Sequence, residues 1–428
     1  MNKQVFLCVG CTLLTLTAVS AKEYHTDHFI INSDLNPLYV QFIRANAEAY
    51  YANMQKQYFE IAWRKPLTIY YSRTQADTQR LLEEHGYYAN VDRGRYEPNV
   101  PAVYTHQFMN DGAFNGWNSL FHEITCHFIH QNFQNPPEWF EEGLTSFLGD
   151  QARIVKGKLI VAEPNPRVGQ ILKSRIDEGR RFNIKALFST SKEKLYRLPG
   201  RCQFAQVFFY WLNETEQLRL YLANARQKGY EFSVLEETVA SSLTKINKEL
   251  ADFIEANCQA APHLQDARQA EDHAQKEQAF LKALQIKPDY QAAQLDLAKC
   301  YNRAKDYENC RKHLKQILND PQSTEFLRAA TLMANTYYKQ KDYTNALEYY
   351  NKAWEYAACY EYKYIVAYRI GYCYEHLENT PCATQAYKNY LDYNWQPDKN
   401  KKATDHARQY LEYADTVQTK QADCQKEY

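Results

Sequence analysis

Hydrophobic and polar positions divide the chain into three parts. Between residues 26 and 110, short apolar runs alternate with amphipathic stretches, which is typical of an α/β arrangement. The expected strands are residues 27–32, 66–71 and 101–105, and the expected helices are residues 37–59 and 75–85. From residue 111 to residue 258 the pattern is mostly helical, apart from a predicted hairpin at 154–161 that turns at Lys156-Gly157-Lys158.

The C-terminal part, from about residue 264, carries an internal repeat. Three sets of five positions share one spacing and lie 36 and 37 residues apart. The sets are Ala298, Tyr301, Cys310, Leu314 and Ile317; Ala334, Tyr337, Ala346, Tyr350 and Ala353; and Gly371, Tyr374, Ala383, Tyr387 and Tyr390. Small residues let paired helices approach, and aromatic residues fill the gap between units. The pattern resembles the tetratricopeptide repeat, an all-α solenoid of stacked helix pairs, and this resemblance implies docking of a protein or peptide.

Length and charge narrow the class of protein. The chain has 428 residues, more than one compact core usually holds, so we expect two or three domains. Its 51 basic residues balance 51 acidic residues, and no strip of basic and aromatic residues stands out. Because phosphate backbones are bound by basic surfaces, nucleic acid is not expected as a partner.

The first 21 residues have the pattern of a secretory signal peptide. Lys3 supplies the positive start, residues 5–16 are apolar, and Val19-Ser20-Ala21 precedes a predicted cut before Lys22. Acylation of Cys11 is a weaker alternative, because only ten residues precede it. No later run of about 20 apolar residues predicts an integral membrane segment. We therefore expect an exported protein, either periplasmic or secreted.

Export changes how the cysteines are interpreted, because oxidising compartments permit disulfides. Nine of the 11 cysteines follow Ala21. Cys300 with Cys310, and Cys373 with Cys382, occupy facing helices at equivalent places in two repeats. The sequence leaves two alternatives open for them, disulfide clips or free buried thiols.

Residues 121–150 hold the densest group of chemically active side chains. His122 and Glu123 open an amphipathic helix, and Cys126 follows His122 by about one turn, with His127 beside it. Positions i and i+4 lie about 40° apart around a helix, so a metal bound by His122 is within reach of position 126. In the zinc-enzyme pattern His-Glu-x-x-His, two histidines bind the metal and the glutamate activates its water. Here a cysteine stands where the second histidine is expected.

A second acidic segment follows one loop later. Residues 137–144, PEWFEEGL, resemble the Pro-x-Trp-Phe-x-Glu-Gly-Leu motif of bacterial peptidase MA-like proteins, which are zinc metallopeptidases of the gluzincin type. The resemblance covers roughly residues 25–258 and implies an α+β zincin-like domain, a small sheet plus helices, in front of the solenoid. On this match Glu142 is the third zinc ligand, and Glu141 is the variable position of the motif.

The two motifs together predict a metal site. His122, Cys126 and Glu142 are the expected ligands of Zn²⁺, and Glu123 is the expected general base for peptide hydrolysis. His127 is the alternative ligand if a local π-bulge turns it inward. Support for the histidine ligand is expected from a carboxylate or carbonyl, and one candidate is Asp150. Candidate donors to the oxyanion are Tyr196, Arg197, Arg201 and Tyr210.

The cysteine leaves two functions open. A His-Cys-Glu set neutralises bound zinc, whereas His-His-Glu leaves one positive charge, so the zinc would acidify its water less. The first function is an exported zinc metallopeptidase whose repeats dock protein or peptide. The second is an inactive pseudo-peptidase that serves as a tetratricopeptide-repeat scaffold. The expected domains are a signal peptide (1–21), an α/β part (22–110), a mostly helical catalytic-like part (111–258) and the repeat domain (264–428).

Overall fold

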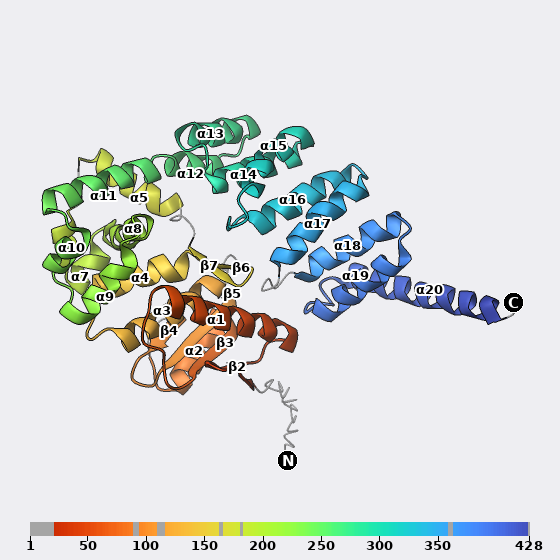
Figure 1. Ribbon diagram of the computed structural model, residues 1–428, viewed down its shortest axis with the longest axis horizontal. Coiled ribbons are helices and arrows are strands. Elements are labelled where there is room, and N and C mark those ends of the chain that lie inside the picture. The colour runs from red at the N-terminus through yellow and green to blue at the C-terminus, as the bar shows by residue number, and fades with distance from the viewer. Residues whose placement is uncertain are drawn as a thin grey trace, which may run out of the picture.

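In the computed structural model, an arch of paired helices is joined to a mixed α/β domain (Figure 1). The structure describes residues 21–88, 94–108, 116–161, 166–179, 183–357 and 363–426. The expected signal peptide therefore lies outside the described residues, apart from Ala21. We call residues 21–258 the front domain and residues 259–426 the repeat domain.

Five strands of the front domain form one mixed sheet in the order β1-β2-β3-β5-β4. They are β1 (Lys22–His25), β2 (Phe29–Ser33), β3 (Leu67–Thr74), β4 (Gly94–Glu97) and β5 (Ala102–Phe108). β2, β3 and β5 run parallel, and β1 and β4 pair antiparallel at the two edges. The parallel strands confirm the three that the apolar runs predicted. The edge strands were not predicted, because their sequences, KEYH and GRYE, are short and mostly polar.

Helices surround this sheet and build the rest of the front domain. They are α1 (Pro37–Gln57), α2 (Gln75–Glu84), α3 (Gly116–Asn132), α4 (Glu138–Thr145), the π-helical turn η1 (Ser146–Asp150), α5 (Pro166–Asp177), α6 (Ile184–Phe188), α7 (Lys192–Arg197), α8 (Arg201–Glu214), α9 (Leu218–Lys228), α10 (Phe232–Val239) and α11 (Leu243–Cys258). The predicted hairpin is present as β6 (Ala152–Val155) and β7 (Lys158–Val161). Its turn residues Lys156 and Gly157 both have positive φ, as a two-residue hairpin turn of this kind requires.

Two glycines determine how closely the helices around the candidate site approach. A Cβ on Gly149 would lie 2.4 Å from the His122 Cα, so η1 packs directly on the backbone of α3. A Cβ on Gly143 would lie 2.9 Å from the backbone of Ala205, so α4 packs equally closely on α8. The glycine of the predicted Glu-Gly-Leu segment therefore has a packing function.

The repeat domain consists of consecutive antiparallel helix pairs and a final helix (Figure 1). The helices are α12 (Ala261–Gln269), α13 (His273–Ile286), α14 (Gln291–Arg303), α15 (Tyr307–Leu318), α16 (Phe326–Lys339), α17 (Tyr343–Tyr356), α18 (Lys363–His376), α19 (Thr380–Tyr393) and α20 (Lys401–Lys426). Of the 15 positions aligned in the sequence, all are buried except Tyr337 and Tyr374, which are half-buried. The predicted helical repeats are confirmed.

The turns inside three successive pairs have the same construction. In each, a residue with positive φ precedes a cap whose side chain accepts a hydrogen bond from the backbone N–H three positions later. The positive-φ residues are Lys305, Lys341 and Glu378, and the caps are Asp306, Asp342 and Asn379.

The repeat domain contacts the front domain at both of its ends. At the start, α12 packs on α5, where a Cβ on Gly169 would lie 2.6 Å from the Ala261 Cβ. At the far end, the ring of Trp395 packs at a tilt against Tyr39 of α1, with ring centroids 4.6 Å apart. The arch therefore returns to the domain from which it starts, as Figure 1 shows.

The hairpin joins the two domains near the middle of the arch. The Lys156 ammonium lies 3.3 Å from the Glu355 carboxylate and 4.0 Å from the centre of the Tyr356 ring. Val155 packs against the apolar core of the middle repeats. The predicted turn of the hairpin is thus also a contact with α17.

Four cysteines of the repeats are described, and all four are thiols. Cys300, Cys310, Cys373 and Cys382 are all free, so the disulfide alternative is wrong in this structure. Cys300 and Cys310 pack as small apolar residues in the core, whereas Cys382 is exposed and its expected partner Cys373 is fully buried. Among the described residues, no helix is long and apolar enough to cross a membrane.

Candidate functional site

The N-terminal half of α3 brings the first predicted site residues together. His122 hydrogen-bonds with the thiol of Cys126, one turn later on the same helix. Its Nδ1 donates to Oδ1 of Asp150 at 3.1 Å, which requires the proton to sit on Nδ1. Asp150 reaches this position because Gly149 lets η1 lie against α3. The predicted support of His122 by Asp150 is therefore present.

Burial and neighbouring charges shift the pKa values of His122 and Cys126 in opposite directions. Burial disfavours the charged imidazole, but the carboxylate of Asp150 and the hydrogen bonds outweigh it and raise the pKa of His122. Burial raises the pKa of the Cys126 thiol to about 12, and the hydrogen bond with His122 offsets only part of that rise. In the absence of a bound cation, the side chain of Cys126 is a neutral thiol at physiological pH.

Glu123 lies on the other side of the same turn, beneath the edge strand β4. It is 7% exposed, and burial raises the pKa of its carboxyl to about 7. His122 and a hydrogen bond from the Tyr96 backbone N–H act in the opposite direction. A Cβ on Gly94 would lie 3.1 Å from Cγ of Glu123, so β4 passes directly over this carboxyl. A carboxyl that titrates near neutral pH is suited to proton transfer.

Glu142 has its own hydrogen-bond partners. Its Oε2 accepts a hydrogen bond from the Tyr196 hydroxyl at 2.9 Å, and its Oε1 accepts one from Oγ of Ser146 at 3.3 Å. Burial, followed by the charge of Glu142, raises the pKa of Tyr196, which keeps this hydroxyl a donor. Tyr196, one of the four candidate oxyanion donors, therefore binds the predicted third ligand.

His127, the alternative ligand, points into the interior of the front domain. Its Nδ1 lies 2.9 Å from the Tyr96 hydroxyl, and its ring packs against Trp63 with centroids 4.4 Å apart. Burial lowers the pKa of His127 to about 3, so the imidazole is neutral. α3 continues without a π-bulge at this residue.

Sequence reasoning missed a neighbouring ion pair. Glu141, the variable position of the motif, accepts a hydrogen bond from Nε2 of His130 at 3.0 Å, and this bond raises the pKa of His130. Tyr96, which contacts both Glu123 and His127, was missed as well. The eleven-residue separation of His130 and Glu141 is no helical spacing and gave no signal. Tyr96 lies on an edge strand that was itself unpredicted.

The arrangement of these residues bears on whether they can hold zinc. Structural and catalytic zinc sites use at least three protein ligands. The part of the chain that the structure describes contains no group of three or more His, Cys, Asp or Glu side chains placed to hold a metal ion. His122 and Cys126 meet, but the hydrogen bonds of Glu142 go to Tyr196 and Ser146. Zinc binding by His122, Cys126 and Glu142 therefore stays a prediction, and it requires Glu142 to release these partners.

Comparisons with known proteins bear on the repeat domain. Two crystal structures of MamA align with this chain at 17% identity, with TM-scores of 0.28 and 0.29. The alignments cover 36% and 40% of this chain and 94% and 95% of those chains. No curated protein matches the chain. A family model described as tetratricopeptide repeat matches residues 259–336, so the C-terminal region contains tetratricopeptide repeats.

Proposed function

We propose that this protein is a docking scaffold whose tetratricopeptide repeats bind a protein or peptide partner. The observation that carries the proposal is the match of residues 259–336 to the repeat family, together with the helix pairs that continue to α19. Repeat solenoids of this kind present extended surfaces to partners. The front domain, with its peptidase-like motifs, anchors both ends of the arch.

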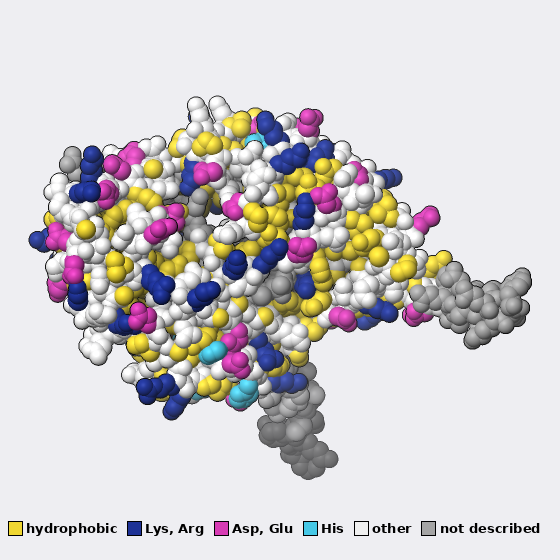
Figure 2. Space-filling model, in the orientation of Figure 1, with side chains coloured by type: hydrophobic (Ala, Val, Ile, Leu, Met, Phe, Trp, Pro, Cys, Tyr) yellow, Lys and Arg dark blue, Asp and Glu magenta, His cyan; other side chains and the backbone are white. Residues whose placement is uncertain are grey.

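One face of the later repeats has the composition of a binding surface. Hydrophobic side chains, tyrosine included, gather over α16 to α18 on the face shown in Figure 2. We define the aromatic surface from the contacts among its members rather than from this view, as Tyr338, Tyr343, Arg369, Tyr372 and His376. All are half-buried except His376, which is exposed.

Contacts within the aromatic surface hold it in one arrangement. Tyr338 and Tyr372 lie on successive repeats with ring centroids 5.6 Å apart, and Tyr343 lies 4.6 Å from His376. The guanidinium of Arg369 lies 4.9 Å above the Tyr338 ring. Tyrosine and arginine dominate the energetics of protein interfaces, and preordered side chains lose little entropy on binding. A partner is therefore expected to dock here.

Selection of displayed peptides on the immobilised protein tests the scaffold function. Enriched sequences should bind wild type, and Tyr338→Ala with Tyr372→Ala should weaken binding at least tenfold. Tyr88→Ala, which removes a tyrosine that is 85% exposed on the front domain, is the matched control. Failure to enrich any sequence, or equal weakening by the control, would argue against the proposal.

The second candidate function is the zinc metallopeptidase expected from the motifs, with His122, Cys126 and Glu142 as ligands and Glu123 as base. What favours it is the pair formed by His122 and Asp150 beside a carboxyl whose pKa is about 7. It requires Glu142 to exchange Tyr196 for the metal, so it ranks below the scaffold.

Zinc content of the purified protein separates the two functions. The peptidase requires about one zinc per chain, lost in Cys126→Ala and in Glu142→Ala. Tyr196→Phe removes the hydroxyl that occupies Glu142 and should then tighten zinc binding. Glu123→Gln should keep the zinc and abolish peptide hydrolysis. A protein that binds no zinc, or hydrolyses peptides equally with Glu123→Gln, is no such enzyme.

Location outside the cytoplasm is part of the same proposal. It rests on the signal-peptide pattern of residues 1–21. N-terminal sequencing of the mature protein from the native host should begin at Lys22. A mature chain that keeps residues 1–21, recovered from the cytoplasm, would contradict it.

A further inference from the structure

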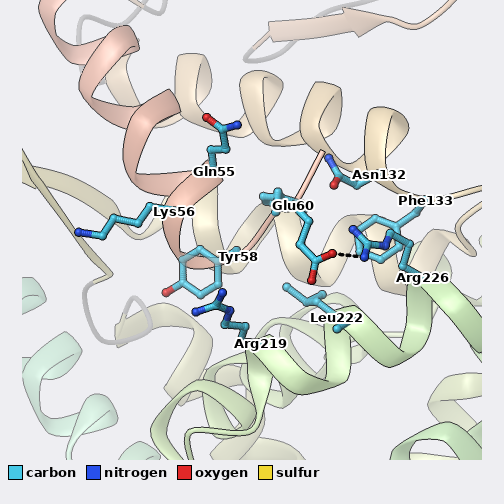
Figure 3. A pocket seen from close by; sticks show the side chains of 11 residues that line it. Gln55, Lys56, Tyr58, Glu60, Asn132, Phe133, Arg219, Leu222 and Arg226 are labelled. Carbon is cyan, nitrogen blue, oxygen red and sulfur yellow. Dashed lines mark hydrogen bonds and ion pairs between the residues drawn. The ribbon is translucent and has the colours of Figure 1, made fainter. Parts of the chain in front are cut away.

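A pocket of about 270 Å³ lies on the front domain, away from the candidate site (Figure 3). Its walls come from the end of α1 and the following loop, the end of α3, and one face of α9. Asn132 at this end of α3 is ten residues from His122, about 15 Å along the helix axis. The pocket therefore belongs to neither of the functions proposed above.

The inner wall of the pocket is apolar and fixed. Phe59, Phe133 and Leu222 line it, and each is at most 6% exposed. The rings of Phe59 and Phe133 pack edge to face with centroids 6.2 Å apart. Both ends of the Asn132 amide hydrogen-bond the backbone of Ile61, which holds the loop in place. This wall is suited to an aromatic or aliphatic group.

The rim of the pocket carries excess positive charge. Arg226 is paired with Glu60, as the dashed line in Figure 3 shows. Arg219 and Lys56 also line the pocket, and no hydrogen bond or ion pair joins either of them to another described residue. Arg219, Leu222 and Arg226 follow one another at helical spacing, so the two guanidinium groups flank the apolar wall on one face of α9. Among the lining residues one carboxylate stands against three cations, and even with Glu214, whose charge acts on Tyr58 from outside the lining, the cations are in excess.

We infer that this pocket binds a carboxylate attached to an aromatic or aliphatic group. The apolar group would lie against Phe59, Phe133 and Leu222, and the carboxylate would pair with Arg219 at the rim. Arginine binds carboxylates through two parallel N–H donors, which also fixes the orientation of the ligand. The inference does not depend on the scaffold function, because the aromatic surface belongs to the repeat domain.

The size of the pocket limits the ligand. Small-molecule sites usually occupy about 300–1,000 Å³, so a volume of about 270 Å³, just below that range, accommodates a single side chain with its acid group. Two sources share this chemistry, a free small carboxylate and the last residue of a peptide chain. 3-Phenylpropionate and its neutral primary amide are a matched pair of test compounds for the shared chemistry.

Titration followed by protein-observed NMR tests the inference on the full chain. The acid should bind at least tenfold more tightly than the amide, with shifts at Phe133 and Leu222. Arg219→Gln should weaken binding of the acid about tenfold and leave binding of the amide unchanged. Arg64→Gln removes an exposed arginine outside the pocket and is the matched control for charge. Equal binding of acid and amide, or equal effects of the two variants, overturns the inference.

A second variant tests the cavity independently of charge. Ala223 lines the pocket and is half-exposed, so Ala223→Phe should fill the space without unfolding α9. Binding of the acid should be lost while the thermal midpoint stays within a few degrees of wild type. Retained binding in this variant also overturns the inference.

Peptides then separate the two sources of the carboxylate. An acetylated tripeptide that ends in Phe should bind at least tenfold more tightly than 3-phenylpropionate if the natural ligand is a chain end. Its C-terminal amide should then lose that gain. Weaker binding of the peptide than of 3-phenylpropionate assigns the pocket to a free small acid.

Discussion

The front domain and the repeat domain hold their structures by different means. The front domain depends on contacts that each occur once, often between residues far apart in the chain. The Tyr50 hydroxyl, for example, bonds to the Leu148 carbonyl at 3.0 Å across 98 residues. The repeat domain uses the same local contacts several times, as its caps and its buried small residues show. We therefore expect equivalent substitutions to destabilise the front domain more.

The largest difference in stability between the two domains is expected when a closely packed glycine is replaced by alanine. A Cβ on Gly149 meets backbone atoms of His122 at 2.4 and 2.7 Å, and backbone cannot rotate away. Gly149→Ala should lower the free energy of unfolding by about 3 kcal/mol. In Gly371→Ala, the three atoms nearest to the new Cβ all belong to the Tyr387 ring, the first at 2.8 Å. The substitution also gains helix propensity of about 1 kcal/mol, so its net cost should be about 1 kcal/mol.

Hydrogen exchange resolved by segment measures the loss of stability in each variant, because it reports the protection of each domain separately. Loss of protection should appear in α3 and η1 for Gly149→Ala and in α18 and α19 for Gly371→Ala. Equal losses in the two variants would contradict the distinction between unique and repeated contacts.

The second difference between the domains concerns how their stability depends on pH. His106 lies fully buried in β5, and burial lowers its pKa to about 4 from an ordinary 6.5. Between those two values the unfolded chain binds a proton that the folded chain does not, so stability falls as the pH drops from 6.5 to 4. The loss should be on the order of 1–3 kcal/mol and confined to the front domain.

Urea unfolding at several pH values tests this prediction. His106→Gln should weaken the dependence over that range and leave the part that His127 contributes, because burial lowers the pKa of His127 to about 3. His25→Gln, at an exposed histidine, is the control. A repeat domain that loses stability in parallel would indicate that the two domains unfold as one unit.

The two regions also differ in what the sequence could predict. The repeats were predicted in detail, because the same spacing of small and aromatic residues occurs in three helix pairs and chance agreement among three copies is rare. In the front domain, the apolar runs predicted β2, β3 and β5, and the spacing of four residues predicted that His122 and Cys126 would meet. Local pattern was sufficient wherever the contact lay within one helix or one buried strand.

Contacts that depend on three-dimensional approach escaped prediction. The bond from Tyr196 to Glu142 joins helices 54 residues apart, and no local pattern encodes it. β4 was not predicted, because its sequence is mostly polar. The hydrogen bond from the Tyr96 backbone N–H to Glu123 was therefore not predicted either. The pocket beside α9 is likewise built from three separate segments.

Removing one tyrosine hydroxyl from each domain compares their stabilities at the level of a single hydrogen-bonding group. Tyr50 is fully buried, and its hydroxyl lies 2.6 Å from Oγ1 of Thr125 and donates to the Leu148 carbonyl. Tyr50→Phe leaves that buried carbonyl without this donor and should cost about 2 kcal/mol. Tyr350→Phe removes one bond to the partly buried Asn335 and should cost about 1 kcal/mol. Chemical denaturation of the two variants measures the difference, and a reversed order would contradict it.

The smallest effects are expected at the repeated caps. Asp342 accepts a hydrogen bond from the Asn345 N–H at 3.1 Å, and Asp342→Ala should cost about 1 kcal/mol. Asn379→Ala removes the equivalent bond to Cys382, at 3.2 Å, and should cost about as much. Because the caps lie in neighbouring units without shared partners, the double variant should lose the sum of the two. Denaturation of the four proteins gives that sum directly. A double variant that loses much more would show that the units stabilise one another through their turns, so that the repeat domain depends on cooperative contacts as the front domain does.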